Sequence, residues 1–154
     1  MTLESILLRK FAEARSGRPT QTPITVDDPH NRGTVTVDVE VCDTLGCRVR
    51  QIQIVRREPL TDLAAAARRY ADRVTGLLES LTLHEIDAAR QMALLRSDVP
   101  AAKGEDVSYY EMTVTPTELK LRRWKGNRNV SGRSQIAFAL TNEALVKLLE
   151  DLLN

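Results

Sequence analysis

Alternating apolar and polar residues predict a β-hairpin over residues 35–54. Valine stands at positions 35, 37, 39 and 41, separated by polar residues, and a period of two is typical of a strand with one buried face. We expect the loop at Asp43–Gly46, where Gly46 can supply the positive φ of a tight return. The predicted opposite pairs are Val35–Ile54, Val37–Ile52, Thr36–Gln53 and Asp38–Gln51. This register gathers the apolar side chains on one face, which then needs a cover.

A second hairpin is predicted over Val107–Lys125, with Thr115–Glu118 as its loop. The opposite pairs are then Val114–Leu119, Met112–Leu121, Tyr109–Trp124 and Glu111–Arg122. The first two pairs are apolar and share one face. The other face carries an aromatic pair and an opposite-charge pair, which are both favourable cross-strand neighbours.

Helical spacing of apolar residues predicts three helices. We expect Thr2 and Thr61 to cap the first two, and Thr141 or Asn142 to cap the third. Gly17–Pro19 should end the first helix. The predicted bounds are Thr2–Arg15, 61–80 and 142–153. The central helix is the expected cover for the valine face.

Residues 81–97 admit two interpretations. One is a hairpin with strands at Leu83–Ile86 and Met92–Leu95 around Asp87–Arg90. The other is a further long helix, because the segment is rich in helix-forming residues. We favour the hairpin, because Leu81–Leu83 poorly continues a helix that already has its expected length.

The remaining segments are short. Ile24–Val26 can add an edge strand, and Gln135–Leu140 is expected to be a last strand with alternate residues on one face. Ser97–Asp106 is predicted to be a polar loop, and Gly126–Arg133 a basic turn region. Together the elements predict one α+β domain over residues 1–154, with an antiparallel sheet of about five to seven strands packed against about three helices.

Composition narrows the function classes. The chain has 22 basic and 21 acidic residues and a formal net charge of +1, which gives no overall attraction to nucleic acid or an anionic membrane. No apolar run approaches the roughly 18 residues that span a bilayer. Glu4, Arg9 and Lys10 interrupt the apolar positions near the start, unlike a signal peptide. We therefore expect a cytoplasmic protein without a membrane partner.

The residues that carry chemistry are few. Cys42 and Cys47 flank the first loop and lie opposite each other in the predicted register, so they could form a disulfide. Because they lack the C-x-x-C spacing of redox or zinc sites, we expect reduced thiols. A zinc site needs four ligands, and the only histidines, His30 and His84, are far apart in sequence. Two aspartates just before His30 are interpreted as turn residues, although carboxylates and an imidazole can also do acid–base work. With no known catalytic motif present, the sequence supports no enzymatic activity, metal or cofactor.

A basic patch is the most suggestive feature. It comprises Lys120, Arg122, Arg123, Trp124, Lys125, Arg128 and Arg133. Tyr109 shares a face with Trp124 in the predicted register, and cations beside aromatic rings are used on single-stranded nucleic acid. A solvated strand face that discourages edge-to-edge pairing, or a protein contact, explains the same residues.

The terminal helix suggests a second contact. Val146 and Leu153 extend its apolar stripe beyond what one contact needs, which indicates another subunit or a frayed end. The order helix, hairpin, helix, strands, helix resembles that of the small dimeric α/β chaperones of bacterial secretion systems, over the first half of the chain and without a shared motif. Our leading hypothesis is a non-enzymatic interaction module, chaperone-like or adaptor, that forms a homodimer through this helix or a sheet edge. The alternative is a nucleic-acid-binding module that uses the region Arg122–Arg133.

Overall fold

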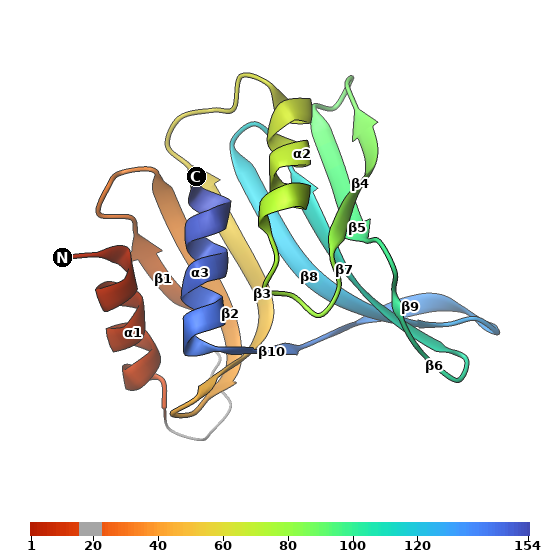
Figure 1. The fold of residues 1–154 in the computed structure, drawn as a ribbon, viewed down its shortest axis with the longest axis horizontal. Coiled ribbons are helices and arrows are strands. Elements are labelled where there is room, and N and C mark those ends of the chain that lie inside the picture. Colours follow the sequence, from red (N-terminus) through yellow and green to blue (C-terminus); the bar gives the residue numbers. More distant parts are fainter. Residues whose placement is uncertain (16–22) are drawn as a thin grey trace.

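A computed structural model describes residues 1–15 and 23–154 (Figure 1). The predicted helix end at Gly17–Pro19 lies outside the described residues. The helices are α1 (Leu3–Glu13), α2 (Leu63–Arg73) and α3 (Asn142–Leu153). The strands are β1 (Ile24–Asp27), β2 (Gly33–Cys42), β3 (Gly46–Arg56), β4 (Leu81–Asp87), β5 (Met92–Ser97), β6 (Ala101–Lys103), β7 (Asp106–Val114), β8 (Glu118–Asn127), β9 (Val130–Ile136) and β10 (Phe138–Thr141). The structure confirms the predicted α+β fold.

The described strands form one antiparallel sheet whose main order is β1-β2-β3-β8-β7-β5-β4. Three strands lie off this order, with β10 pairing β3, β6 pairing β7, and β9 pairing β8. The registers predicted for the two hairpins are confirmed, including Val37 opposite Ile52 and Tyr109 opposite Trp124. The alternation of side chains therefore fixed which residues share a face.

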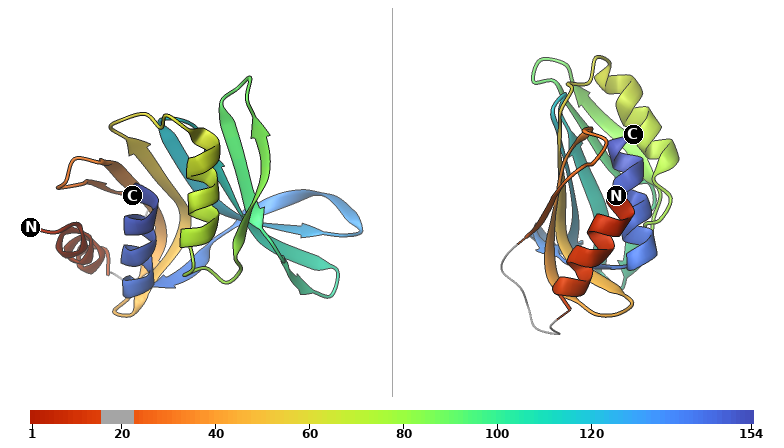
Figure 2. Two further views of the ribbon diagram at one scale, coloured as in Figure 1. Left: turned by 45° about the horizontal axis from the view of Figure 1, so that its top comes forward. Right: turned by 90° about the vertical axis from the view of Figure 1, so that its left-hand side faces the viewer.

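All three helices lie on the same face of the sheet, as the edge-on view in Figure 2 shows. The valines and isoleucines of β2 and β3 point to this side, and Val37, Ile52 and Ile54 have no exposed surface. Each such side chain contributes about 1.5–3 kcal/mol when it leaves water. The central helix is not the expected cover, because α2 packs on β4 and β5; the valine face is covered instead by α3, which contacts β3, and by α1, which contacts β1 and α3.

Two helix caps agree with the sequence. Thr2 caps α1 in a capping box, in which Ser5 N donates to Thr2 Oγ1 and Thr2 N donates to Ser5 Oγ. Thr141 caps α3 by accepting a hydrogen bond from Ala144 N. The cap of α2 is Asp62 rather than Thr61, because its carboxylate accepts from Ala65 N.

The central helix is shorter than predicted. It ends at Arg73, and Val74 takes an extended conformation, so residues 74–80 form a loop before β4. Leu78, which the helical pattern placed in an apolar stripe, is 80% exposed. The loop carries the Glu79 carboxylate to the buried Arg123 guanidinium, with Arg123 Nη1 only 2.8 Å from Glu79 Oε1. Val74, Thr75 and Gly76 have low helix propensity, which agrees with the helix ending here, and the ion pair holds the loop that follows.

Residues 81–97 form the predicted hairpin, β4 and β5. The segment 97–106 is not a simple loop, because β6 adds three residues that pair with β7. The basic turn region also contains more strand than predicted, because β8 continues to Asn127 and β9 starts at Val130. The predicted last strand is divided at Ala137, where the chain leaves its partner β8 and pairs with β3 as β10.

Candidate interaction surface

No helix among the described residues covers the second face of the sheet (Figure 2). Its polar character follows from the alternation of β2, whose Thr34, Thr36 and Asp38 are partly exposed while the valines between them are buried. The same alternation in β7 and β8 presents Tyr109, Glu111 and other predicted contact residues on this uncovered face.

Glu111 is the centre of a group of side chains on this face. Arg96 from β5 approaches it, with 3.0 Å between Arg96 Nε and Glu111 Oε2. Arg133 from β9 binds it with both nitrogens, at 2.7 Å from Nη1 to Oε2 and 3.2 Å from Nη2 to Oε1. Burial of Glu111, which is 6% exposed, acts to raise its pKa, but the hydrogen bonds and charges of the two arginines outweigh burial and hold the pKa below its ordinary value.

Aromatic rings complete the group. The Arg133 Cζ atom lies 3.9 Å from the centroid of the Trp124 ring, and the Arg122 Cζ atom lies 5.2 Å from it. Arg133 Nη1 also donates to Tyr109 Oη at 3.1 Å, while the Arg96 Cζ atom lies 5.7 Å from the Tyr109 ring centroid. We call this group the Glu111 cluster; its members are Arg96, Tyr109, Glu111, Arg122, Trp124 and Arg133.

The cluster differs from the pairing expected in the second hairpin. Glu111 and Arg122 are opposite each other as predicted, but Glu111 pairs with Arg96 and Arg133 while Arg122 stacks on Trp124. Arg133 stands opposite Gly126 in the register of β8 and β9.

The structure separates the remaining basic residues of the predicted patch. Lys120 lies near the cluster but pairs with Glu118 at 3.3 Å, and Lys125 pairs with Asp106 at 3.4 Å. Arg128 is exposed in the turn between β8 and β9. Only Tyr109, Arg122, Trp124 and Arg133 of the predicted patch are therefore brought together.

Arg123 belongs to the opposite face. It is 5% exposed and pairs with Glu79 through two hydrogen bonds, beneath the loop that follows α2. The Glu79 carboxylate also accepts from Ser97 Oγ at 2.9 Å, and the Arg123 Cζ atom lies 4.2 Å from the centroid of the Tyr110 ring. Arg123 thus anchors a loop inside the molecule and is not part of an outer basic surface.

Arg96 is the cluster residue that the sequence did not indicate. The predicted strand ended at Leu95, two residues too early, whereas β5 continues to Ser97 and pairs Arg96 with Glu111. The sequence did contain a usable signal: if the predicted strand is extended by one residue, Arg96 falls beside the acidic Glu111 of the neighbouring strand, and opposite charges are favourable cross-strand neighbours.

The terminal helix does not present the second contact surface predicted from its apolar stripe. Val146 is 8% exposed and Leu153 is 2% exposed. The stripe is wide because α3 lies between α1 and α2 and also contacts β3 and β10, so more than one side of the helix is buried within the chain.

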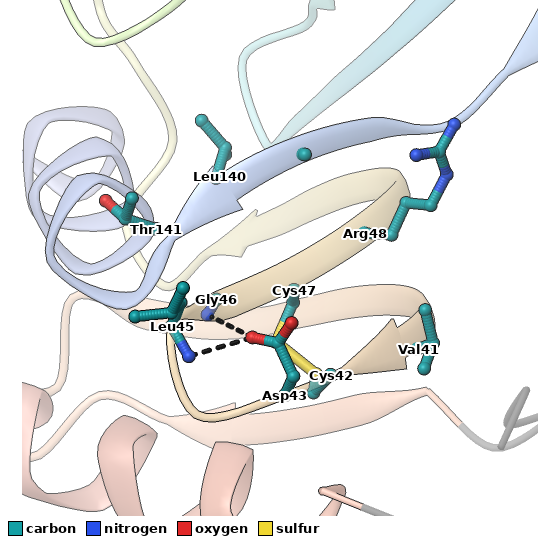
Figure 3. Close-up of a pocket in the computed structure, with 10 residues that line it drawn as sticks. Val41, Cys42, Asp43, Leu45, Gly46, Cys47, Arg48, Leu140 and Thr141 are labelled. Atoms are coloured by element: carbon teal, nitrogen blue, oxygen red, sulfur yellow. Dashed lines mark hydrogen bonds between the residues drawn. A yellow bond between two sulfur atoms is a disulfide. The ribbon is translucent and has the colours of Figure 1, made fainter. Parts of the chain in front are cut away.

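The first hairpin loop carries a disulfide between Cys42 and Cys47, contrary to the expectation of reduced thiols (Figure 3). The two residues are opposite partners in β2 and β3, and their Cα atoms are 4.1 Å apart. The Asp43 carboxylate holds the turn by accepting from Leu45 N and Gly46 N. Gly46 does not have the positive φ that was expected for it.

A pocket of about 410 Å³ lies between this loop and β10 (Figure 3). Its apolar lining includes Val41, Leu140 and the exposed Leu45. The charged residues at its wall are already engaged: the Asp43 carboxylate accepts two backbone N–H groups, and Arg48 lies 3.9 Å from the Glu40 carboxylate. The pocket is therefore apolar in character.

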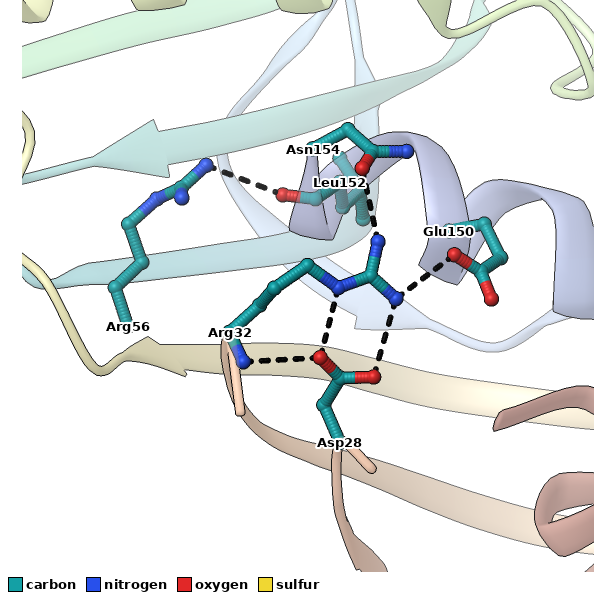
Figure 4. A network of polar contacts seen from close by, with 6 residues as sticks. All are labelled: Asp28, Arg32, Arg56, Glu150, Leu152 and Asn154. Carbon is teal, nitrogen blue, oxygen red and sulfur yellow. Dashed lines mark hydrogen bonds and ion pairs between the residues drawn. The ribbon is translucent and has the colours of Figure 1, made fainter. Parts of the chain in front are cut away.

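A polar network fixes the turn between β1 and β2 to the end of α3 (Figure 4). Arg32 donates to both carboxylate oxygens of Asp28 and, across the chain, to Glu150 Oε2 and Asn154 Oδ1. Burial acts to raise the pKa of Asp28, but hydrogen bonds and the charge of Arg32 outweigh it, so the pKa lies below its ordinary value. Asp28 thus builds the turn, as the sequence indicated, whereas Asp27 is the last residue of β1 and accepts a hydrogen bond from Thr34 Oγ1.

The last turn of α3 contains no basic residue of its own. Cations from other elements replace it: Arg56 Nη2 donates to Leu152 O at 3.4 Å, and Arg69 Nη2 donates to Asn154 O at 3.3 Å. Tyr70 Oη also donates to Leu152 O. These groups satisfy helix carbonyls and oppose the negative end of the helix dipole.

Within residues 1–15 and 23–154, no three acidic, histidine or cysteine side chains are grouped so as to hold a metal ion. In the same ranges, no helix has the length and apolar character needed to cross a membrane. Comparison of the chain with family models, curated proteins and solved structures finds no match.

Proposed function

We propose that this chain is a non-enzymatic protein-interaction module that binds its partner at the Glu111 cluster, on the uncovered face of the sheet. The observation that carries the proposal is the concentration of arginine, tyrosine and tryptophan on this face. Arginine and aromatic residues are enriched at protein interfaces, and Trp, Tyr and Arg supply most of the residues whose truncation costs the most binding energy.

The cluster is also well ordered for binding. Arg133 is held by Glu111 and Tyr109, and Trp124 is packed against two guanidinium groups. Side chains that are already fixed lose little conformational entropy when a partner arrives. The same contacts explain why an acidic residue is retained at the centre of a basic surface, because Glu111 orients the arginines.

The nucleic-acid alternative has less support in this arrangement. Lys120, Lys125 and Arg133 each have a carboxylate partner within 4 Å, which neutralises much of the predicted basic patch. Nucleic-acid affinity depends mainly on cations that neutralise phosphates. A partner that uses the aromatic and guanidinium surfaces together suits the cluster better.

Self-association remains part of the proposal, through a sheet edge or through this face. Association through the terminal helix is no longer proposed, because Val146 and Leu153 are buried within the chain. The main order of the sheet ends at β1 and β4, and an edge strand can pair with another chain. Light scattering at micromolar concentration distinguishes a dimer from a monomer and thereby identifies a second copy as the partner.

The experiment compares Trp124→Ala with Thr36→Ala in quantitative capture of binding proteins by the full chain. Thr36 lies on the same face, on β2. We expect the Trp124 variant to lose at least tenfold in affinity for the captured partner, which corresponds to about 1.4 kcal/mol, while the Thr36 variant binds normally. Equal binding by both variants, with unfolding midpoints like that of the original chain, would refute the assignment of this surface.

A further inference from the structure

We infer that the partner presents an acidic segment whose carboxylates bind Arg122 and Arg133 beside Trp124. This inference rests on the proposed function and names the chemical class of the partner. It follows from three properties of the Glu111 cluster: its charge, the geometry of its guanidinium groups, and a hydrogen-bond donor that it leaves unused.

The cluster has an excess of positive charge. It contains three arginines and a single carboxylate, Glu111, which leaves two positive charges without an internal counterpart. Arg122 shows the imbalance most clearly, because no carboxylate among the described residues lies within 4 Å of its guanidinium group. A surface with this local charge is complementary to an acidic segment, even though the whole chain is nearly neutral.

The guanidinium groups are arranged in a way that suits carboxylates. Arg122 and Arg133 both pack against the Trp124 ring, with Cζ atoms no more than 5.2 Å from its centroid. Stacking uses the flat surface of a guanidinium, while its N–H groups lie in the plane and match the two oxygens of a carboxylate. Arg122 has no carboxylate partner among the described residues, whereas Arg133 already donates from both Nη groups to Glu111 and offers its remaining N–H groups. Because both groups contact one ring, neighbouring carboxylates of a single short segment can reach both.

Trp124 leaves a donor unused. Its Nε1–H is buried and donates to no acceptor among the described residues. Buried donors are usually satisfied, so an unsatisfied one at a candidate site favours a ligand that brings an acceptor oxygen. A carboxylate or a backbone carbonyl of the bound segment supplies that oxygen when the side chains that cover Nε1–H move aside on binding.

The sheet also sets a spacing for the acidic residues. Arg96, Glu111 and Arg122 are successive cross-strand neighbours on β5, β7 and β8. Adjacent strands lie about 4.8 Å apart, so the Cα atoms of Arg96 and Arg122 are roughly 10 Å apart. An extended segment advances about 3.3 Å per residue, and two acidic residues separated by two others are therefore about 10 Å apart and span the cluster when the segment crosses the strands.

The test uses intrinsic fluorescence, because Trp124 is the only tryptophan in the chain and reports on the site directly. The full chain is titrated with a synthetic peptide that has glutamate at every third position and glycine between, with the matching lysine and glutamine peptides as controls, and with oligothymidine. We expect the glutamate peptide alone among the three peptides to give a saturable change in emission. The affinity should fall when salt is raised, because exposed charges are screened.

The variant Arg122→Gln isolates the contribution of charge, since Arg122 takes part in no ion pair with any described residue and its loss leaves Glu111 with both of its partners. The matched control is Arg90→Gln, in the turn between β4 and β5, where the side chain is 82% exposed. We expect at least a tenfold loss of affinity for the glutamate peptide in the first variant and no change in the second. Both variants should keep the unfolding midpoint of the original chain.

The outcomes separate the inference from the proposed function. If the glutamate peptide leaves the emission unchanged while Trp124→Ala still abolishes partner capture, the partner is not acidic, and the interaction surface stands. If the peptide binds but the Trp124→Ala variant captures the partner as well as the original chain does, the proposed function fails. Tighter binding of oligothymidine than of the peptide would overturn the inference in favour of a nucleic-acid site.

Discussion

The buried pair of Glu79 and Arg123 gives the sharpest test of how this fold is held together. The side chains are 9% and 6% exposed, and two hydrogen bonds of 2.8 and 3.1 Å join them. The pair connects the loop after α2 to β8, and Ser97 Oγ donates to the same carboxylate. The perturbation is Glu79→Gln, which keeps the shape of the side chain and removes its charge.

The expected cost follows from what the substitution leaves behind. Arg123 stays charged and buried against Tyr110, without its counterion, and such a change costs about 3 kcal/mol or more. Arg123→Met should cost less, about 2 kcal/mol, because the Glu79 carboxylate is on a loop that can turn it toward water. The double variant should cost about 3 kcal/mol, so the two residues are coupled by about 2 kcal/mol.

Urea unfolding followed by circular dichroism measures each free energy of unfolding. With a slope of about 2 kcal/mol per molar urea, Glu79→Gln should lower the midpoint by about 1.5 M. The double-mutant cycle compares the original chain, the two single variants and the double variant. It therefore separates the interaction between Glu79 and Arg123 from a general loosening of the loop. A loss below about 1 kcal/mol for Glu79→Gln, or single effects that add within about 0.5 kcal/mol, would refute the reasoning.

Three further predictions concern the turns that join β1, β2 and β3. Asp28→Asn should lower the free energy of unfolding at neutral pH by about 1–3 kcal/mol. The folded pKa of Asp28 lies below its unfolded value, so the contribution of its carboxylate is present above about pH 4 and disappears as pH falls through the folded pKa. The urea midpoints of the two proteins should therefore converge in acid. Gly46→Ala should destabilise the chain by more than 1 kcal/mol in the same assay, because a Cβ there would lie 2.1 Å from the backbone oxygen of Leu140. Replacing Cys42 and Cys47 by serine should cost about 2 kcal/mol, the chain-entropy value for so short a loop, and mass spectrometry with and without a reductant checks the bridge.

The sequence predicted the sheet well because local pattern and packing agree there. In the hairpin of β2 and β3, a slip of one residue would move Ile52 and Ile54 to the polar side, so a single register satisfies the pattern. Helix ends were less predictable. The poor helix formers Val74, Thr75 and Gly76 signal the end of α2, but the apolar spacing that continues to Leu81 hides it. The path of the loop that follows is held by Arg123, a residue 44 positions after Glu79, and local sequence contains no information about such a partner.

Gly46 shows a second limit of local reasoning. Its position beside a tight turn favours a positive φ, but glycine is needed there because β10 approaches the hairpin closely. The approach of β10 depends on the division of the last strand at Ala137, which the alternation of Ile136, Phe138 and Leu140 does not reveal. The sequence analysis thus singled out Gly46 for its backbone conformation, whereas the structure requires glycine there because β10 packs closely against it.

The Glu111 cluster shows why a run of charges on a strand must be divided by face before it is given a function. Arg122 and Arg123 are adjacent in sequence, yet one stacks on Trp124 at the uncovered face while the other is buried beneath the loop after α2. Counting both arginines therefore overestimates the positive charge of the uncovered face. A strand that stops at Leu95 also omits Arg96, which lies beside Glu111 and two strands away from Arg122. The surface that results is smaller and more ordered than the linear patch, with one internal acid orienting two cations and a third cation left for a partner. Such a surface favours recognition of a few carboxylates at defined spacing over diffuse attraction to a polyanion.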